Sequence, residues 1–314
     1  MLGLLARRLA FTVPMLVVVS FCVFSLIVLV PGDPAVALAG ENPDPEQIAA
    51  VRERLGLDDP FLVQFWHWFS GVLQGDLGQS LFSSQSVAAA VFSRLPATLS
   101  LALLSLAVAL VLGVAVGVLA AMRPGTWIDR VATFAASLGV AVPYFWVGMI
   151  LVLLFAINLT IFPAVGYVPL TENPLQWFLH LFLPATALGL APAAVIARQT
   201  RAGMTGVLRE DYVRTATAKG LPPARVVGQH ALKNAAVPVV TAFGLEASRL
   251  IGGTVVIEQL FALPGLGNLA YTSVFARDFP MVQGVLLVVA ALVLLINLLV
   301  DLSYGYFNPR IRQS

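Results

Sequence analysis

The segment DYVRTATAKGLPPARVVGQHALKNAAVP, from Asp211 to Pro238, separates two long apolar stretches of the chain. It is polar and basic, and its residues favour helix up to Gly220 and again after Pro222-Pro223. The surrounding protein is strongly apolar, with 59% hydrophobic and 11% charged residues in the whole chain. This contrast predicts an all-α integral membrane protein that keeps one ordered polar segment outside the bilayer.

Six stretches are apolar and close to the ~20 residues that a helix needs to cross a bilayer. They are Leu9 to Val30, Ala97 to Met122, Val131 to Asn158, Trp177 to Ala197, Val239 to Ile257, and Met281 to Leu302. We therefore expect six transmembrane helices in a single domain over residues 1–314. A cleaved signal peptide is the alternative interpretation of Arg7-Arg8 and the first stretch, but that stretch is longer than a signal h-region.

The distribution of Lys and Arg predicts the orientation, because basic loops stay on the cytoplasmic side. Thirteen of these residues lie in the N-terminal segment, the second and fourth loops and the C-terminal tail, against four in the other three loops. Both termini are therefore expected in the cytoplasm. The same orientation makes residues 31–96 an extracytoplasmic loop subdomain and residues 198–238 a cytoplasmic loop.

Composition and motifs argue against several classes of function. The net charge of +2 is too small to indicate nucleic-acid binding. A single cysteine, Cys22, and three scattered histidines make an internal disulfide or a metal site unexpected. No constellation of nucleophile and base is visible, so we predict no catalytic residues and no enzyme. Neither of the two lysines, Lys219 and Lys233, follows a glycine, which rules out a P-loop.

Two helices are expected inside the cytoplasmic loop. The first runs from Met204 to Ala218 and ends at Gly220, and the second runs from about Pro223 to Asn234. Joined at a glycine, they form a stiff elbow that can transmit the movement of a soluble partner to the spans.

The cytoplasmic loop resembles the EAA loop of ABC-importer permeases, which docks into a cleft of the ATPase subunit. Anchoring the family pattern on Gly220 places Arg214-Thr215-Ala216 at Glu-Ala-Ala and His230-Ala231-Leu232-Lys233 at Ile-x-Leu-Pro. Ala216, Gly220 and Leu232 match that general pattern. Arg214 stands where the family has an acid, and so it cannot make the same ion pair with a basic ATPase residue.

The particular form DYVRTAxAKG followed by HALKNAxxP is similar to the first permease subunit of dipeptide, oligopeptide and nickel importers. Ordered blocks over nearly the whole chain carry the same resemblance. They are PGDP from Pro31, GLDDP from Gly56, GDLGQS from Gly75, LPATLSLAL from Leu95, GGTVVIEQLFALPGLG from Gly252, and NLLVDLSYGYFNPRIR from Asn297. The resemblance implies the fold of a type I ABC-importer permease in the bacterial inner membrane.

The resemblance also implies partners and functional residues. The partners would be a second permease subunit, two ABC ATPase subunits that bind ATP and Mg²⁺, and an extracytoplasmic substrate-binding protein. This chain would bind no cofactor. Di- or oligopeptides are the expected substrates, with nickel and glutathione left open. The residues implied in coupling to the ATPase are Tyr212, Arg214, Thr215, Ala216, Ala218, Lys219, Gly220, His230, Leu232 and Asn234.

Four charged residues lie in or beside the last two spans, where an unpaired charge is costly. Glu246 and Arg249 share one helical face, and we favour a structural pair over a direct role in substrate passage. Glu258 is expected at the outer mouth, where it either holds the PGLG turn or meets the binding protein. Asp301 is expected to pair locally with the basic C-terminal tail near the inner face.

The alternative function is a self-sufficient, ion-coupled secondary transporter with Glu246, Arg249 and Asp301 as an ion relay. The absence of a visible inverted repeat in the sequence favours the importer. Gly113 and Gly117 form a small-xxx-small pair in the second span, which predicts close approach of another helix.

Overall fold

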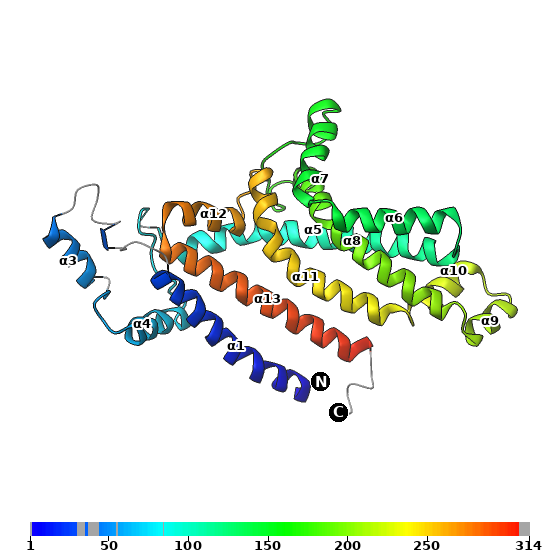
Figure 1. Cartoon of the computed structure of the whole chain (residues 1–314), viewed down its shortest axis with the longest axis horizontal. Coiled ribbons are helices and arrows are strands. Elements are labelled where there is room, and N and C mark those ends of the chain that lie inside the picture. The colour runs from blue at the N-terminus through cyan, green and yellow to red at the C-terminus, as the bar shows by residue number, and fades with distance from the viewer. Residues whose placement is uncertain (1, 30–34, 37–43, 55, 84, 308–314) are drawn as a thin grey trace.

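The computed structural model describes residues 2–29, 35–36, 44–54, 56–83 and 85–307. Within them the chain is helical, with one isolated bridge between Gln79 and Ser86 and no strand. The longest helices are α1 (Leu2–Leu29), α5 (Val87–Met122), α8 (Pro174–Val207), α11 (Ala236–Leu260) and α13 (Phe279–Phe307). They run side by side along the long axis of the molecule (Figure 1).

Shorter elements lie at the two ends of this bundle. At one end are α3 (Pro45–Arg54), α4 (Phe61–Leu73) and α12 (Leu266–Ala276). At the other are α9 (Asp211–Ala218), α10 (Pro223–Arg225) and the π-helix η2 (Val226–Leu232). The start of α1 and the end of α13 point toward the end that carries α9 (Figure 1).

Four helices are long and apolar enough to cross a membrane, namely α5, α8, α11 and α13. In α1 the described apolar part is shorter and runs from Ala10 to Leu26. The spans extend beyond the predicted limits, and side chains cap the starts of two of them, Ser86 at α5 and Asn173 at α8. The Asn173 side chain accepts the backbone N–H groups of Leu175 and Gln176, each at 3.1 Å, at the start of α8. The number of six spans and the side on which the termini lie remain predictions.

The prediction of one continuous third span is wrong. The segment forms α6 (Trp127–Ala141), then α7 (Tyr144–Leu151) and the π-helix η1 (Val152–Asn158), bent by 103° between α6 and α7. Pro143 lies at the bend, and Val142 before it has extended angles of φ −84° and ψ 129°. A residue that precedes proline avoids the helical region, and proline has no N–H to continue the ladder. As a result α7 points away from the bundle (Figure 1).

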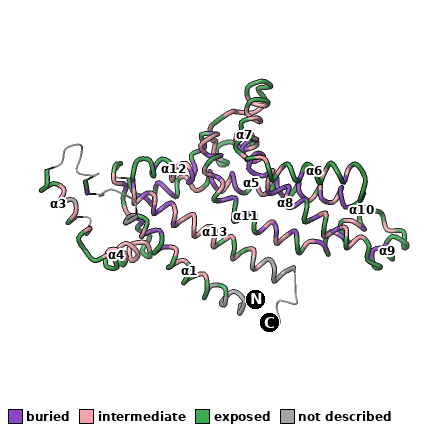
Figure 2. Tube along the Cα trace, in the orientation of Figure 1, coloured by how far each residue is buried: buried purple, intermediate pink, exposed green. Residues whose placement is uncertain are grey.

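The core of the bundle lies where α5 packs on α8, and Figure 2 shows buried residues along both helices. The glycine pair of the second span lies at this contact, as predicted. A Cβ atom on Gly113 would lie 2.7 Å from the Cβ of Ile196, and one on Gly117 would lie 2.5 Å from that of Thr200. Gly189 of α8 also lies at this contact, since a Cβ there would lie 2.6 Å from the Ser105 carbonyl oxygen of α5. Small residues therefore set the spacing between these two helices.

We predict that Gly117→Ala destabilises the protein by about 1 to 3 kcal/mol, because the added methyl group overpacks the contact with α8. Gly206→Ala is the matched control, since a Cβ at that helical position meets nothing within 4 Å. Thermal melting of the detergent-solubilised complex measures the difference. Equal melting temperatures for the two variants would contradict the packing described here.

Candidate functional site

The cytoplasmic loop forms an elbow, which we define as residues 211–234, with α9 on one side and α10 with η2 on the other. Gly220 lies between them with φ +78°, in the left-handed region that favours glycine. Its neighbours close the end of α9: the Lys219 N–H donates to the Thr215 carbonyl oxygen at 3.0 Å, and the Leu221 N–H donates to that of Ala216 at 3.3 Å. Gly220 therefore ends the helix as the sequence predicts.

The prediction of one helix from Met204 to Ala218 is wrong, because α8 ends at Val207 and α9 begins at Asp211. Glu210 between them is extended, with φ −68° and ψ 147°. The turn lets the side chains of Val207 and Leu208 pack against two apolar clusters at once, one inside the elbow and one beneath it. Tertiary packing thus interrupts a stretch whose residues individually favour helix.

The two apolar clusters fix the elbow to the spans. The inner one contains Val213 and Ala216 of α9 and Val226 of η2. The other joins Ala231 of η2 to Met204 of α8, Ala121 of α5 and Ala235. Since these residues are buried, a force on α9 or η2 reaches the ends of α5 and α8 through close-packed side chains.

A polar network closes the elbow on its other side. The Asn234 amide donates to the Tyr212 hydroxyl at 2.9 Å and to the His230 carbonyl oxygen at 2.8 Å. The same carbonyl oxygen accepts the Tyr212 hydroxyl at 3.4 Å. Three residues implied in ATPase coupling are therefore joined to one another, and they hold α9 against η2.

The residues implied in coupling fall into two groups. Ala216 is buried inside the elbow, and His230 and Leu232 are half-buried. The remaining ones are exposed and form its outer surface: Tyr212, Arg214, Thr215, Ala218, Lys219, Gly220 and Asn234. Arg214 pairs with Asp211 at 3.3 Å, but both side chains are largely exposed, so this ion pair adds little stability. The exposed group is the surface that a soluble partner can reach.

The charges of α11 have partners within the chain. Glu246 and Arg249 form the ion pair that their spacing suggests, with 3.1 Å between Oε1 and Nη1. Glu258 is completely buried and accepts the Thr98 hydroxyl at 2.7 Å and the Asn268 N–H at 2.9 Å. These contacts and the absence of exposed surface favour the first of the two expected roles of Glu258, holding the PGLG turn, and the role itself stays a prediction. The Asp301 side chain and the basic tail lie outside the described residues.

Two further polar contacts were not predicted. Asp129 of α6 is buried and paired with Arg201 of α8, whose Nη2 donates to Oδ2 at 2.8 Å. At the opposite end of the bundle, Asp278 accepts the Ser80 hydroxyl at 2.5 Å and the Leu81 N–H at 3.2 Å. The sequence signal for Asp278 was the GDLGQS block, which includes Ser80 but does not reveal its partner.

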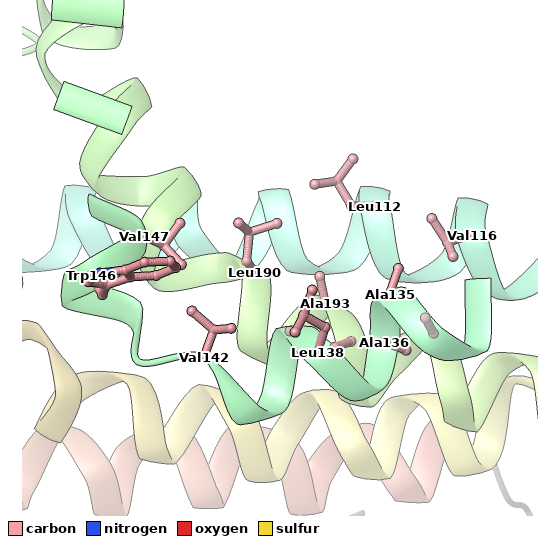
Figure 3. Close-up of a pocket in the computed structure, with 13 residues that line it drawn as sticks. Leu112, Val116, Ala135, Ala136, Leu138, Val142, Trp146, Val147, Leu190 and Ala193 are labelled. Atoms are coloured by element: carbon pink, nitrogen blue, oxygen red, sulfur yellow. The ribbon is translucent and has the colours of Figure 1, made fainter. Parts of the chain in front are cut away.

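An apolar groove of about 420 Å³ lies where α6 and α7 diverge, bounded also by α5 and α8 (Figure 3). Its walls include Leu112, Leu138, Val142, Trp146 and Leu190. In the part of the chain that the structure describes, no three His, Cys, Asp or Glu side chains gather as a metal site would require.

A bundle of apolar spans with a rigid polar elbow at one end is the arrangement of a membrane subunit that responds to a soluble partner. Comparison with known proteins identifies the class. The family described as binding-protein-dependent transport system inner membrane component matches residues 113–313, and its N-terminal counterpart matches residues 1–102. The chain therefore belongs to this family and is a multi-pass inner membrane permease of the ABC-importer class.

Individual relatives agree over nearly the full length. The chain is 44% identical over 312 residues, 99% of each protein, to a peptide transport system permease protein of Brucella abortus (strain 2308). It is 42% identical to the di/tripeptide transport system permease protein DppB of Pseudomonas aeruginosa, covering 100% of both, and 43% identical to the glutathione transport system permease protein GsiC of Escherichia coli, covering 99% of both.

A solved structure agrees in fold. An inward-facing structure of the MetNI methionine ABC transporter gives a TM-score of 0.55 at 20% identity, covering 68% of this chain and 93% of that one. This likeness supports the all-helical permease architecture. As a member of the binding-protein-dependent family, the chain works with ATPase and substrate-binding subunits.

Proposed function

We propose that this chain is a translocation subunit of an ATP-driven importer of di- or oligopeptides. It pairs with a second permease and two ABC ATPase subunits, and it receives substrate from an extracytoplasmic binding protein. ATP and Mg²⁺ bind to the ATPase subunits, and this chain catalyses no reaction. The names of the full-length relatives support the peptide substrate.

The observation that carries the proposal is the packing of the elbow. Its outer surface is polar and exposed, while its inner surface is tied to α5 and α8 through Met204, Ala231 and Ala121. A secondary transporter driven by an ion gradient has no need of such a connection to a soluble partner. An ATPase that closes and opens on the elbow can move the spans without contacting them.

We expect the tagged chain, extracted gently from native membranes, to retain a second permease and ATPase subunits that mass spectrometry identifies. Proteoliposomes that hold the complex should import peptide only when ATP is on the side of the membrane that carries the ATPase subunits. Binding protein must be present on the opposite side. Recovery of the chain alone, with uptake driven by an ion gradient, would instead establish a secondary transporter.

A further inference from the structure

Arg249 stands out among the charged residues of the described spans. It lies about 20 Å along α11 from Ala236, near the middle of the helix, and 75% of its side chain is exposed. Exposed or half-buried residues recur along the same face of α11 at Thr241, Leu245, Gly252 and Val256. Arg249 thus belongs to an open face of the helix and is not turned into the core.

An exposed guanidinium at this depth is informative because lipid tails cannot solvate it. Charged side chains within spans almost always face a water-filled cavity or another protein group. The outward faces of the neighbouring helices look different, with Leu295 and Leu299 of α13 and Leu103 and Val111 of α5 exposed. Those exposed residues are apolar, whereas the open face of α11 places the charged Arg249 between the apolar Leu245 and Val256.

The surroundings of Arg249 form a hollow between α8 and α11 of about 420 Å³. It extends from Val237, near the elbow end of α11, to Arg249. Gln199, Thr241 and Glu246 add polar groups to its wall. It differs from the groove of the same volume in Figure 3, whose walls are apolar. A hollow of this size, with a few convergent polar groups, has the character of a ligand site.

Glu246 positions Arg249 but uses only part of the hydrogen-bonding capacity of its guanidinium. The Glu246 side chain is 10% exposed, and its Oε1 accepts from Nη1 of Arg249 at 3.1 Å. A guanidinium has five N–H donors arranged as a planar fork, and this ion pair uses one of them at a residue that lines the hollow. This fork matches a carboxylate, which it can bind through two parallel hydrogen bonds.

We propose that Arg249, positioned by Glu246, lines the translocation pathway and binds the carboxylate of the peptide as it passes. This inference rests on the proposed peptide substrate, since peptides with a free C-terminus carry such a group. The structural ion pair between Glu246 and Arg249 that the sequence predicts is present. Because the guanidinium is also exposed, we assign the pair a second role in binding substrate.

The first test measures whether water reaches Arg249 in the assembled transporter. Cys22, the single cysteine, is replaced by serine, and Arg249→Cys is compared with Leu295→Cys, which is 50% exposed on α13. We expect aminoethyl methanethiosulfonate to modify Arg249→Cys at least tenfold faster. Equal rates, or protection of Arg249→Cys by the second permease, would overturn the proposal. This readout needs no transport, so it is independent of the substrate assignment.

The second test addresses the carboxylate. Arg249→Gln should lower peptide uptake at least tenfold, while the amount of assembled complex recovered from membranes stays within twofold of the wild type. Arg249→Lys should retain part of the uptake, and aminoethylation of Arg249→Cys should restore it where methylation does not. Unchanged uptake by Arg249→Gln, or by the double variant Glu246→Leu with Arg249→Leu, would show a purely structural pair. If the wild-type complex imports no peptide, the proposed function fails instead.

Discussion

Replacement of Gly220 by valine is expected to abolish ATP-driven uptake while the protein still inserts and assembles. The expected effect comes from backbone strain and not from a steric clash. Gly220 has φ +78°, and a Cβ there would meet nothing within 4 Å. A β-branched residue held in this region costs on the order of 1 to 3 kcal/mol, so the elbow opens or changes its angle. We expect at least a tenfold loss of uptake, with ATPase activity no longer stimulated by the binding protein.

Two controls separate this effect from simple damage to the loop. Gly228→Ala lies in the same elbow, has no left-handed backbone and also meets nothing within 4 Å, so its uptake should stay near that of the wild type. Gly220→Asn should retain most of the activity because asparagine tolerates the left-handed region. If Gly220→Val transports as well as Gly228→Ala, the geometry of the elbow does not matter for coupling.

Gly265→Ala is expected to have the largest effect on folding. A Cβ at Gly265 would overlap the Glu258 carboxyl group, which is completely buried. Moving that carboxyl group breaks its hydrogen bonds to the Thr98 hydroxyl and the Asn268 N–H, and a buried polar group without partners is costly. Overpacking and the lost bonds together should destabilise the protein by about 3 kcal/mol or more.

The matched control is Gly253→Ala on α11, where the added methyl group would make an ordinary contact of 3.6 Å with Leu188. The amount of chain recovered in membranes and its melting temperature in detergent measure both variants. Glu258→Gln should also be unstable, because its amide group cannot accept both bonds. Wild-type stability of Gly265→Ala would mean that the PGLG turn does not depend on Glu258.

The features that the sequence predicts well are those encoded locally. Hydropathy places the apolar helices, and Gly220 followed by Pro222-Pro223 marks the end of one elbow helix and the start of the next. The glycine spacing at Gly113 and Gly117 also predicts the close contact with another helix, although it does not say which one.

The features that the sequence does not predict depend on tertiary contacts, or on a proline whose effect is hidden by a long apolar stretch. Glu258 and Thr98 are 160 residues apart, and Asp129 and Arg201 are 72 apart, so no local pattern reveals either pair. Pro143 was visible, but the hydropathy of residues 131–158 is high enough to hide the bend that it causes. The turn at Leu208 lets Val207 and Leu208 pack against two apolar clusters whose other residues come from distant parts of the chain.

The most direct test of the central claim is site-specific photocrosslinking from the elbow in native membranes. A benzophenone amino acid is placed at Lys219, which is exposed, and in a separate variant at Phe275 of α12, which is 73% exposed at the opposite end of the bundle. We expect mass spectrometry to find an ABC ATPase subunit joined to position 219 and none at position 275. No ATPase adduct at position 219, or equal adducts at both positions, would contradict the role of the elbow in ATP-driven import.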